Sequence, residues 1–196
     1  MNKKTGGYLV AAFIGVIAIY TIVTYNGLVA KDEVVKKQWN EVNSAYQRRV
    51  DLIPNLVNVV KGQANFEQSV LVQVTEARAK ASAVAVSSQE LTAENVNQQA
   101  AIQNQLAAAA SRLLITVEKY PELKGTAAFE GLQVQLEGTE RRIKVARKDF
   151  NEAIAAYNSS VKSFPTSLVG SLLGFKPKEG FQSDAGAEKT IDVNFK

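Results

Sequence analysis

Residues 48–62 read RRVDLIPNLVNVVKG, and the predicted fold is organised around them. Asp51 is a residue type that caps helix N-termini, and Pro54 suits a first helical turn while disfavouring helical geometry at the residue before it. Leu56 and Val59 then begin an apolar helical face. The pattern predicts a corner where one helix ends and another begins at Pro54. A plain helix–helix corner and a partner-binding surface are both compatible with it.

The stretch before this corner predicts a membrane anchor. No charged residue occurs in residues 5–30. The most apolar part, residues 6–23, would be about 27 Å long as a helix, close to the hydrocarbon thickness of a bilayer. A cleaved signal peptide is the alternative, but Leu28 stands where cleavage after Ala30 would require a small residue. We therefore expect an uncleaved anchor that runs on into the first helix of the bundle.

The basic residues that flank this anchor nearly balance, so they leave its orientation open. A short basic N-terminal tail followed by one anchor usually leaves the bulk of the chain outside the cytoplasm. We therefore predict a single-pass membrane protein whose bulk is extracytoplasmic. The predicted parts are a basic tail, an anchor, a helical bundle and a C-terminal tail, in residues 1–5, 6–30, 31–164 and 165–196.

Helical periodicity predicts an all-α fold. Before the corner, one face carries Val35, Trp39, Val42, Tyr46 and Val50, and we expect Trp39 to be a core residue. Further helical patterns cover residues 54–86, 91–119 and 129–164. Helices of roughly 30 residues would each span about 45 Å, and the short breaks between them imply antiparallel neighbours. The prediction is a long up-down bundle of about four helices.

The last residues differ in composition, because Gly and Pro punctuate them. Residues 167–174 predict one short helix, and residues 190–195 alternate apolar and polar side chains like a strand. A lone strand must dock on something or stay mobile, since it cannot satisfy its own backbone groups. Both alternatives stay open for this tail.

The composition excludes most enzyme classes. The chain of 196 residues has no Cys and no His, which removes disulfides, thiol nucleophiles, imidazole bases and the common zinc sites. The net charge of +4 is spread over helical stretches that carry both signs, unlike a nucleic-acid footprint. We predict no enzymatic activity, no catalytic residue, no metal, no cofactor and no nucleic-acid partner.

Several blocks of this sequence match a known family. They are YNGLV at residues 25–29, YQRRVDLIPNLV at 46–57, YPEL at 120–123 and FP at 164–165. With these blocks the chain resembles the LemA family of bacterial membrane proteins over nearly its whole length. One departure is Phe150, where the family tends to have a Tyr, so a hydroxyl-based ligand contact is not expected there.

The resemblance implies an N-terminal anchor, a long antiparallel bundle and a place in the bacterial inner membrane. It implies no established enzymatic activity. Genes for membrane proteases or for small TPM-type proteins often lie beside those of family members. An envelope-associated adaptor with such a partner is therefore what the resemblance suggests.

Two functions follow as hypotheses. The first is a membrane-anchored scaffold or adaptor that contacts itself or a membrane partner through helix faces, including its Ala-rich third helix. The second is a bundle that binds lipid or a small apolar ligand between its helices. Ion pairs of Glu67 with Arg78, or of Glu140 with Arg147, are expected to fix helix register. The candidate interface or motif residues are Arg48, Arg49, Asp51, Pro54, Asn55, Glu67, Arg78, Glu140, Arg147, Asn151 and Asn158.

Overall fold

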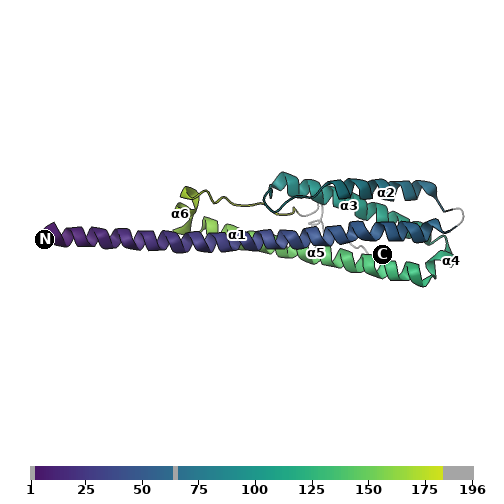
Figure 1. Cartoon of the computed structure of the whole chain (residues 1–196), viewed down its shortest axis with the longest axis horizontal. Coiled ribbons are helices and arrows are strands. Elements are labelled where there is room, and N and C mark those ends of the chain that lie inside the picture. The colour runs from purple at the N-terminus through teal and green to yellow at the C-terminus, as the bar shows by residue number, and fades with distance from the viewer. Residues whose placement is uncertain (1–2, 64–65, 183–196) are drawn as a thin grey trace, which may run out of the picture.

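One helix of 59 residues, α1 (Lys3–Lys61), forms the spine of the protein (Figure 1). The computed structural model describes residues 3–63 and 66–182. At the usual helical rise α1 is about 88 Å long. Its first part extends beyond the bundle, and α1 is the one helix among the described residues that is long and apolar enough to span a membrane. The best window has a mean hydropathy of 2.1, and only 6% of it is buried.

The corner predicted at Pro54 is wrong, because α1 continues through Pro54 to Lys61. Proline has no N–H, so the carbonyl of Val50, four residues earlier, loses its helical donor. The side chain of Arg78 replaces that donor, since its Nε lies 3.2 Å from the Val50 oxygen. Asp51 caps no helix and instead accepts a hydrogen bond of 2.8 Å from Gln47 within α1.

The other helices confirm an all-α bundle with four long helices and two short ones among the described residues. They are α2 (Gln68–Ala83), α3 (Ala93–Val117), α4 (Pro121–Lys124), α5 (Ala127–Lys162) and α6 (Thr166–Leu172). The long helices alternate in direction, with α1 packed along α5 and α2 along α3 (Figure 1). The helix predicted over residues 54–86 is too long at both ends. Residues 54–61 belong to α1, and α2 begins at Gln68 and ends at Ala83.

The buried apolar side chains form two cores along the bundle. The distal core, farther from the apolar end of α1, draws on α1, α2, α3, α4 and α5, and includes Val50, Ile53, Val60, Val74, Leu106, Leu113, Phe129 and Leu136. The proximal core lies between α1 and α5 and includes Val35, Trp39, Val42, Tyr46, Phe150, Ile154, Tyr157 and Phe181. Trp39 is fully buried, so its prediction as a core residue is confirmed.

After α5 the chain turns twice. It first forms α6 beside α1, and residues 175–182 then return along the bundle; we call this returning segment the strap (Figure 1). The short helix predicted over residues 167–174 is confirmed as α6. The strand predicted at residues 190–195 lies outside the described residues.

Candidate functional site

A buried polar layer separates the two cores. It contains Arg49 from α1, Gln103 from α3 and Thr139 from α5, each no more than 2% exposed. Glu140, next to Thr139, reaches the layer from its edge with a side chain that is 43% exposed. The helical register that creates the apolar seams therefore brings polar side chains from three helices to one level.

Arg49 holds this layer together. One guanidinium nitrogen donates to the Gln103 backbone oxygen at 2.8 Å, and the other donates to the Glu140 carboxylate. The guanidinium carbon also lies 5.9 Å from the centre of the Tyr46 ring. A charge taken out of water is stabilised only when it is paired and hydrogen-bonded, and this set of contacts supplies both conditions.

Not every buried polar atom in and beside this layer has a hydrogen-bond partner. Among the described residues, Arg49 Nε and the Tyr46 hydroxyl are buried side-chain atoms without a hydrogen-bond partner. Burial raises the pKa of Tyr46, with the charges of Arg147 and Arg49 opposing it, so the hydroxyl stays neutral at physiological pH. Buried donors without acceptors destabilise a fold, so this layer fixes the alignment of three helices at a cost in stability.

A second polar cluster lies one turn away, where α2 has already ended. The Val86 carbonyl accepts hydrogen bonds from Trp39 Nε1 at 2.8 Å and from Asn43 Nδ2 at 2.9 Å. Gln99 accepts from the Val86 N–H and donates to Asn43. These bonds tie the loop after α2 onto α1 and α3, and they satisfy backbone groups that no helix satisfies.

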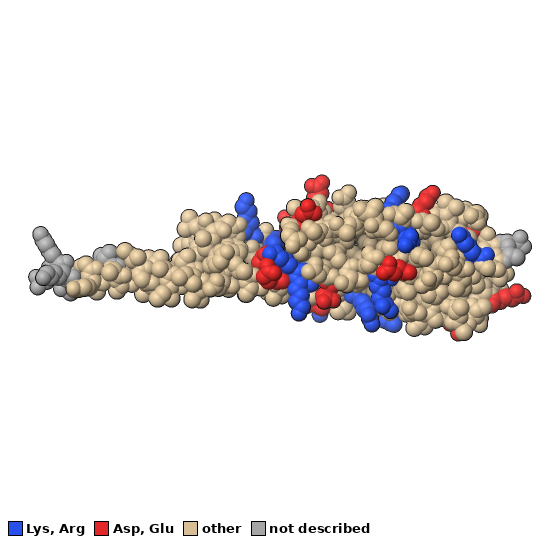
Figure 2. Space-filling view, in the orientation of Figure 1, with Lys and Arg blue, Asp and Glu red and all other residues tan. Residues whose placement is uncertain are grey.

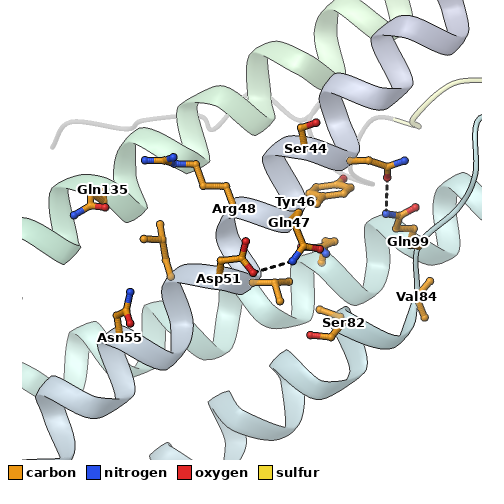
Figure 3. A pocket seen from close by; sticks show the side chains of 16 residues that line it. Ser44, Tyr46, Gln47, Arg48, Asp51, Asn55, Ser82, Val84, Gln99 and Gln135 are labelled. Atoms are coloured by element: carbon orange, nitrogen blue, oxygen red, sulfur yellow. Dashed lines mark hydrogen bonds between the residues drawn. The ribbon is translucent and has the colours of Figure 1, made fainter.

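An open groove of about 690 Å³ lies over this region, and Figure 3 shows its lining. Arg48 and Asn55 are exposed at its side formed by α1, and Gln135 of α5 also lines it. The hydrogen bonds between Gln47 and Asp51 and between Gln99 and Asn43 are drawn there. Of the predicted corner residues, Arg48, Asp51 and Asn55 thus line a surface groove. Arg49 lies inside the bundle, and Pro54 is not among the residues that line the groove.

Arg48 also lines a second open groove, of about 910 Å³, between α1 and α5. Its walls carry charges of both signs, from Glu41, Arg141, Arg142 and Asp149. Neither groove resembles the enclosed apolar cavities that hold small hydrophobic ligands.

Both ion pairs predicted from the sequence are wrong. Glu67 pairs with Lys119 at 3.0 Å, and Arg78 bonds the Val50 carbonyl. Glu140 pairs with Arg49, and the Arg147 guanidinium lies 4.4 Å from the centre of the Phe181 ring. Residues seven or more positions apart on one helix side were expected to pair, but other segments of the bundle offered closer partners.

Asn151 and Asn158 have a clear role, because they hold the strap against α5. Asn158 donates to the Lys178 carbonyl at 2.7 Å and accepts from the Lys178 N–H at 2.8 Å. Asn151 makes the same pair of bonds with Phe181, at 3.2 and 2.9 Å. Two asparagines two helical turns apart therefore bind the backbone of an extended segment, and a Cβ on Gly180 would lie only 2.3 Å from the Asn151 oxygen.

Side chains anchor the strap at both ends. Lys178 pairs with Asp32 of α1 at 2.9 Å, and the Phe181 ring centre lies 5.8 Å from that of Trp39. Burial alone would raise the pKa of Asp32, but hydrogen bonds from Lys178 and Lys36 outweigh it and lower this pKa. The sequence reasoning missed Asp32, Lys178 and Phe181, because no helical period marks an extended segment.

Among the described residues, no group of three His, Cys, Asp or Glu side chains is placed to hold a metal ion. Nor does the polar layer join a nucleophile to a base, since Arg49 is bonded to a carbonyl and a carboxylate. The arrangement fixes helices and a strap relative to one another.

Comparison with known proteins decides the family. The model of the LemA family matches residues 38–195, which include the bundle, the polar layer and the strap. The chain belongs to the LemA family. This match confirms the family that the sequence blocks indicated.

Similar proteins come from several bacteria. Magnetosome proteins MamQ 1 and MamQ 2 of Paramagnetospirillum magneticum are each 25% identical to this LemA-family chain, over 93% of it and 72% of their own length. Magnetosome protein MamQ of Magnetospirillum gryphiswaldense is 24% identical over 87% of this chain and 69% of its own. Protein LemA of Metamycoplasma hominis is 20% identical, over 92% and 79%.

Proposed function

We propose that this membrane-associated helical protein is a scaffold or adaptor of the bacterial inner membrane that acts through protein–protein contacts and associates with itself. The observation that carries the proposal is the continuity of α1, whose apolar first part is exposed and whose second part is the spine of the bundle. Because no loop interrupts α1, there is no hinge between the anchor and the bundle. The bundle therefore keeps a defined orientation relative to the membrane.

The polar layer supports this role. Arg49, Gln103 and Glu140 bind α1, α3 and α5 to one alignment, which suits a protein that presents a fixed surface. The strap adds a second constraint on α5 through Asn151 and Asn158. None of these contacts forms part of a reaction centre, so we propose a function without catalysis.

The face of α3 turned away from the bundle is the proposed surface for self-association. Its exposed residues recur in steps of three and four and are Gln98, Ala101, Gln105, Ala108, Arg112 and Ile115. This spacing is that of a coiled-coil seam, and the two alanines permit close approach of a second helix. Ile115, which is 70% exposed, adds a large apolar side chain that a partner helix could cover.

The test is the mass of the full-length protein, extracted in mild detergent and measured by size-exclusion chromatography with light scattering. We expect one discrete assembly of several copies. Ala108→Glu should reduce it to smaller species, because a charge would be buried in the seam. Ala128→Glu is the matched control, since Ala128 is exposed on α5, outside that face.

A monomer in detergent, together with no crosslinked product in native membranes, would contradict the scaffold. An assembly that persists in Ala108→Glu would keep the scaffold but move its interface to another face.

The open grooves carry amide and charged side chains, which favours a scaffold over lipid binding between the helices. The same proposal places the bundle outside the cytoplasm. It also includes a membrane protease or a TPM-type protein as a partner.

A further inference from the structure

Residues 163–175, which include α6, form a run of 13 residues without a charge, between Lys162 and Lys176. The structure places this run beside the end of the uncharged part of α1 that meets the bundle (Figure 1). Two uncharged segments far apart in the sequence therefore lie side by side. Figure 2 shows the same region of the visible face without charged side chains, whereas the bundle carries both signs.

Specific contacts fix the level of α6 along α1. The Tyr20 and Thr166 hydroxyl oxygens lie 3.3 Å apart, and the Phe175 ring centre lies 5.7 Å from that of Tyr25. Gly170 is buried against Leu28, whose Cδ1 would lie 3.4 Å from an added Cβ. α6 thus spans the level from Tyr20 to Leu28, about 12 Å of helical rise at the edge of the candidate membrane span.

The opposite side of this run presents large apolar side chains to the surroundings. Phe164 is 81% exposed, Leu168 59% and Leu172 86%. These three positions are four residues apart, so the two leucines lie on one face of α6, with Phe164 just before it. The other face carries Thr166 and Gly170 toward α1. The face of the segment toward α1 therefore carries the smaller side chains, and its outward face carries the larger apolar ones.

The nearest charges lie on the bundle side of this level. Lys31 Nζ donates to the Ala156 carbonyl at 3.4 Å and to the Ser160 hydroxyl, which joins α1 to the end of α5. Lys162 and Lys176 flank the uncharged run, and lysines at the ends of a membrane-embedded segment keep their ammonium groups at the interface. The change from charged to uncharged surface occurs at the same level on α1, on α5 and before the strap.

We propose that residues 163–175 dip into the bilayer at the surface where α1 leaves it, so that the protein contacts the membrane at two places. The partner is lipid at the boundary between headgroups and acyl chains, where the outward apolar side chains of residues 163–175 would be buried. The argument for lipid is continuity, because the outward face of α6 extends the apolar surface of the anchor. The inference rests on the anchoring of α1 that the proposed function requires.

This arrangement also assigns a role to the strap. The strap leaves the membrane level at Lys176 and is fixed above it by the ion pair of Lys178 with Asp32 and by the bonds of Asn158. Residues 163–182 would thus be held at the membrane at one end and on the bundle at the other. The membrane-proximal part of the helix pair α1 and α5 would then be fixed relative to the lipid surface.

The absence of Cys allows a direct test in the full-length protein reconstituted in liposomes. Leu172→Cys, Val134→Cys and Val16→Cys are each labelled with an environment-sensitive nitrobenzoxadiazole dye, at positions that are 86%, 64% and 65% exposed. Phospholipids brominated at a shallow or a deep acyl position serve as quenchers. Val134, exposed on α5 at the level of the distal core and outside the proposed self-association face of α3, is the matched apolar control.

We expect dye at Leu172 to emit at shorter wavelength than dye at Val134 and to be quenched by the shallow brominated lipid more than by the deep one. Dye at Val134 should emit as in water and escape quenching. If dye at Leu172 behaves like dye at Val134 while dye at Val16 is quenched, the inference is overturned and the anchoring of α1 stands. A blue shift at Leu172 without quenching would mean that protein covers α6, which also overturns it. Loss of quenching at Val16 would remove the anchoring and this inference together.

Discussion

The distal and proximal cores are built on the same two helices, α1 and α5, yet they close in different ways. In the distal core α2, α3 and α4 cover the pair, and the buried side chains are mostly aliphatic. In the proximal core α2 has ended. The start of α3 still covers the pair through Val96 and Ala100, and a loop and the strap add cover through Val86 and Phe181. Aromatic rings fill the wider space, with the Trp39 ring centre 5.1 Å from that of Phe150. Where a helix is missing, large side chains and extended segments replace it.

The largest effect is expected from Trp39→Ala, which tests the aromatic filling. Trp39 is fully buried and also donates to the Val86 carbonyl, so the loss of unfolding free energy should be about 3–5 kcal/mol. Leu113→Ala is the comparison in the distal core, at about 2–5 kcal/mol. Thermal unfolding of the detergent-solubilised protein, followed by circular dichroism, measures both. Only Trp39→Ala should also make the strap sensitive to protease, and equal protection of the strap in both variants would contradict this difference.

The next effect concerns the polar layer between the cores. Glu140→Ala leaves the buried Arg49 guanidinium with one acceptor residue fewer, which should cost about 2 kcal/mol of unfolding free energy. Adding Arg49→Met should recover part of that loss, because the unpaired charge is then absent. Glu152→Ala, which removes an exposed pair with Lys148, is the control and should change stability by less than about 1 kcal/mol. Additive losses in the double variant would mean that the two residues are not coupled.

A smaller and more local effect is expected at the strap. Asn158→Ala removes two hydrogen bonds to the Lys178 backbone, each worth about 1 kcal/mol. Hydrogen exchange at the amides of residues 176–182 should accelerate while exchange in the distal core stays unchanged. Asn104→Ala, at an exposed position on α3, is the matched control. Equal acceleration in both variants would show that these bonds do not hold the strap.

The smallest effect is the response of the strap to acid. Because the folded protein lowers the pKa of Asp32 below its unfolded value of about 3.9, the ion pair with Lys178 contributes stability above that value. This contribution should be lost as pH falls from about 5 through the folded pKa. Trp39 fluorescence, sensitive to Phe181 beside it, should report the change, and Asp32→Asn should remove the pH dependence in that range. A wild-type response identical to that of Asp32→Asn would contradict the assignment.

Periodicity was enough to predict most of the fold. The seam from Val35 to Val50 and the extents of α3 and α5 appear in the structure within a few residues of prediction, because each rests on many buried side chains at helical spacing. The candidate site was predicted only in part. Asn151 and Asn158 were singled out as candidate interface or motif residues, but the strap that they bind has no periodic pattern, so their contacts within the chain were not predicted. The partner of Arg49 could not be read from one helix.

The sequence by itself determined the apolar N-terminal stretch, the extents of α3 and α5 and the all-α fold, since these depend on local composition and spacing. It also indicated the family, which the match over residues 38–195 then showed. The tertiary structure alone decided that α1 passes through Pro54. A proline removes one backbone donor, and whether a helix tolerates the loss depends on what else reaches the orphaned carbonyl. Here the donor is Arg78, which stands 28 residues from Val50 and reaches it only when α2 packs on α1.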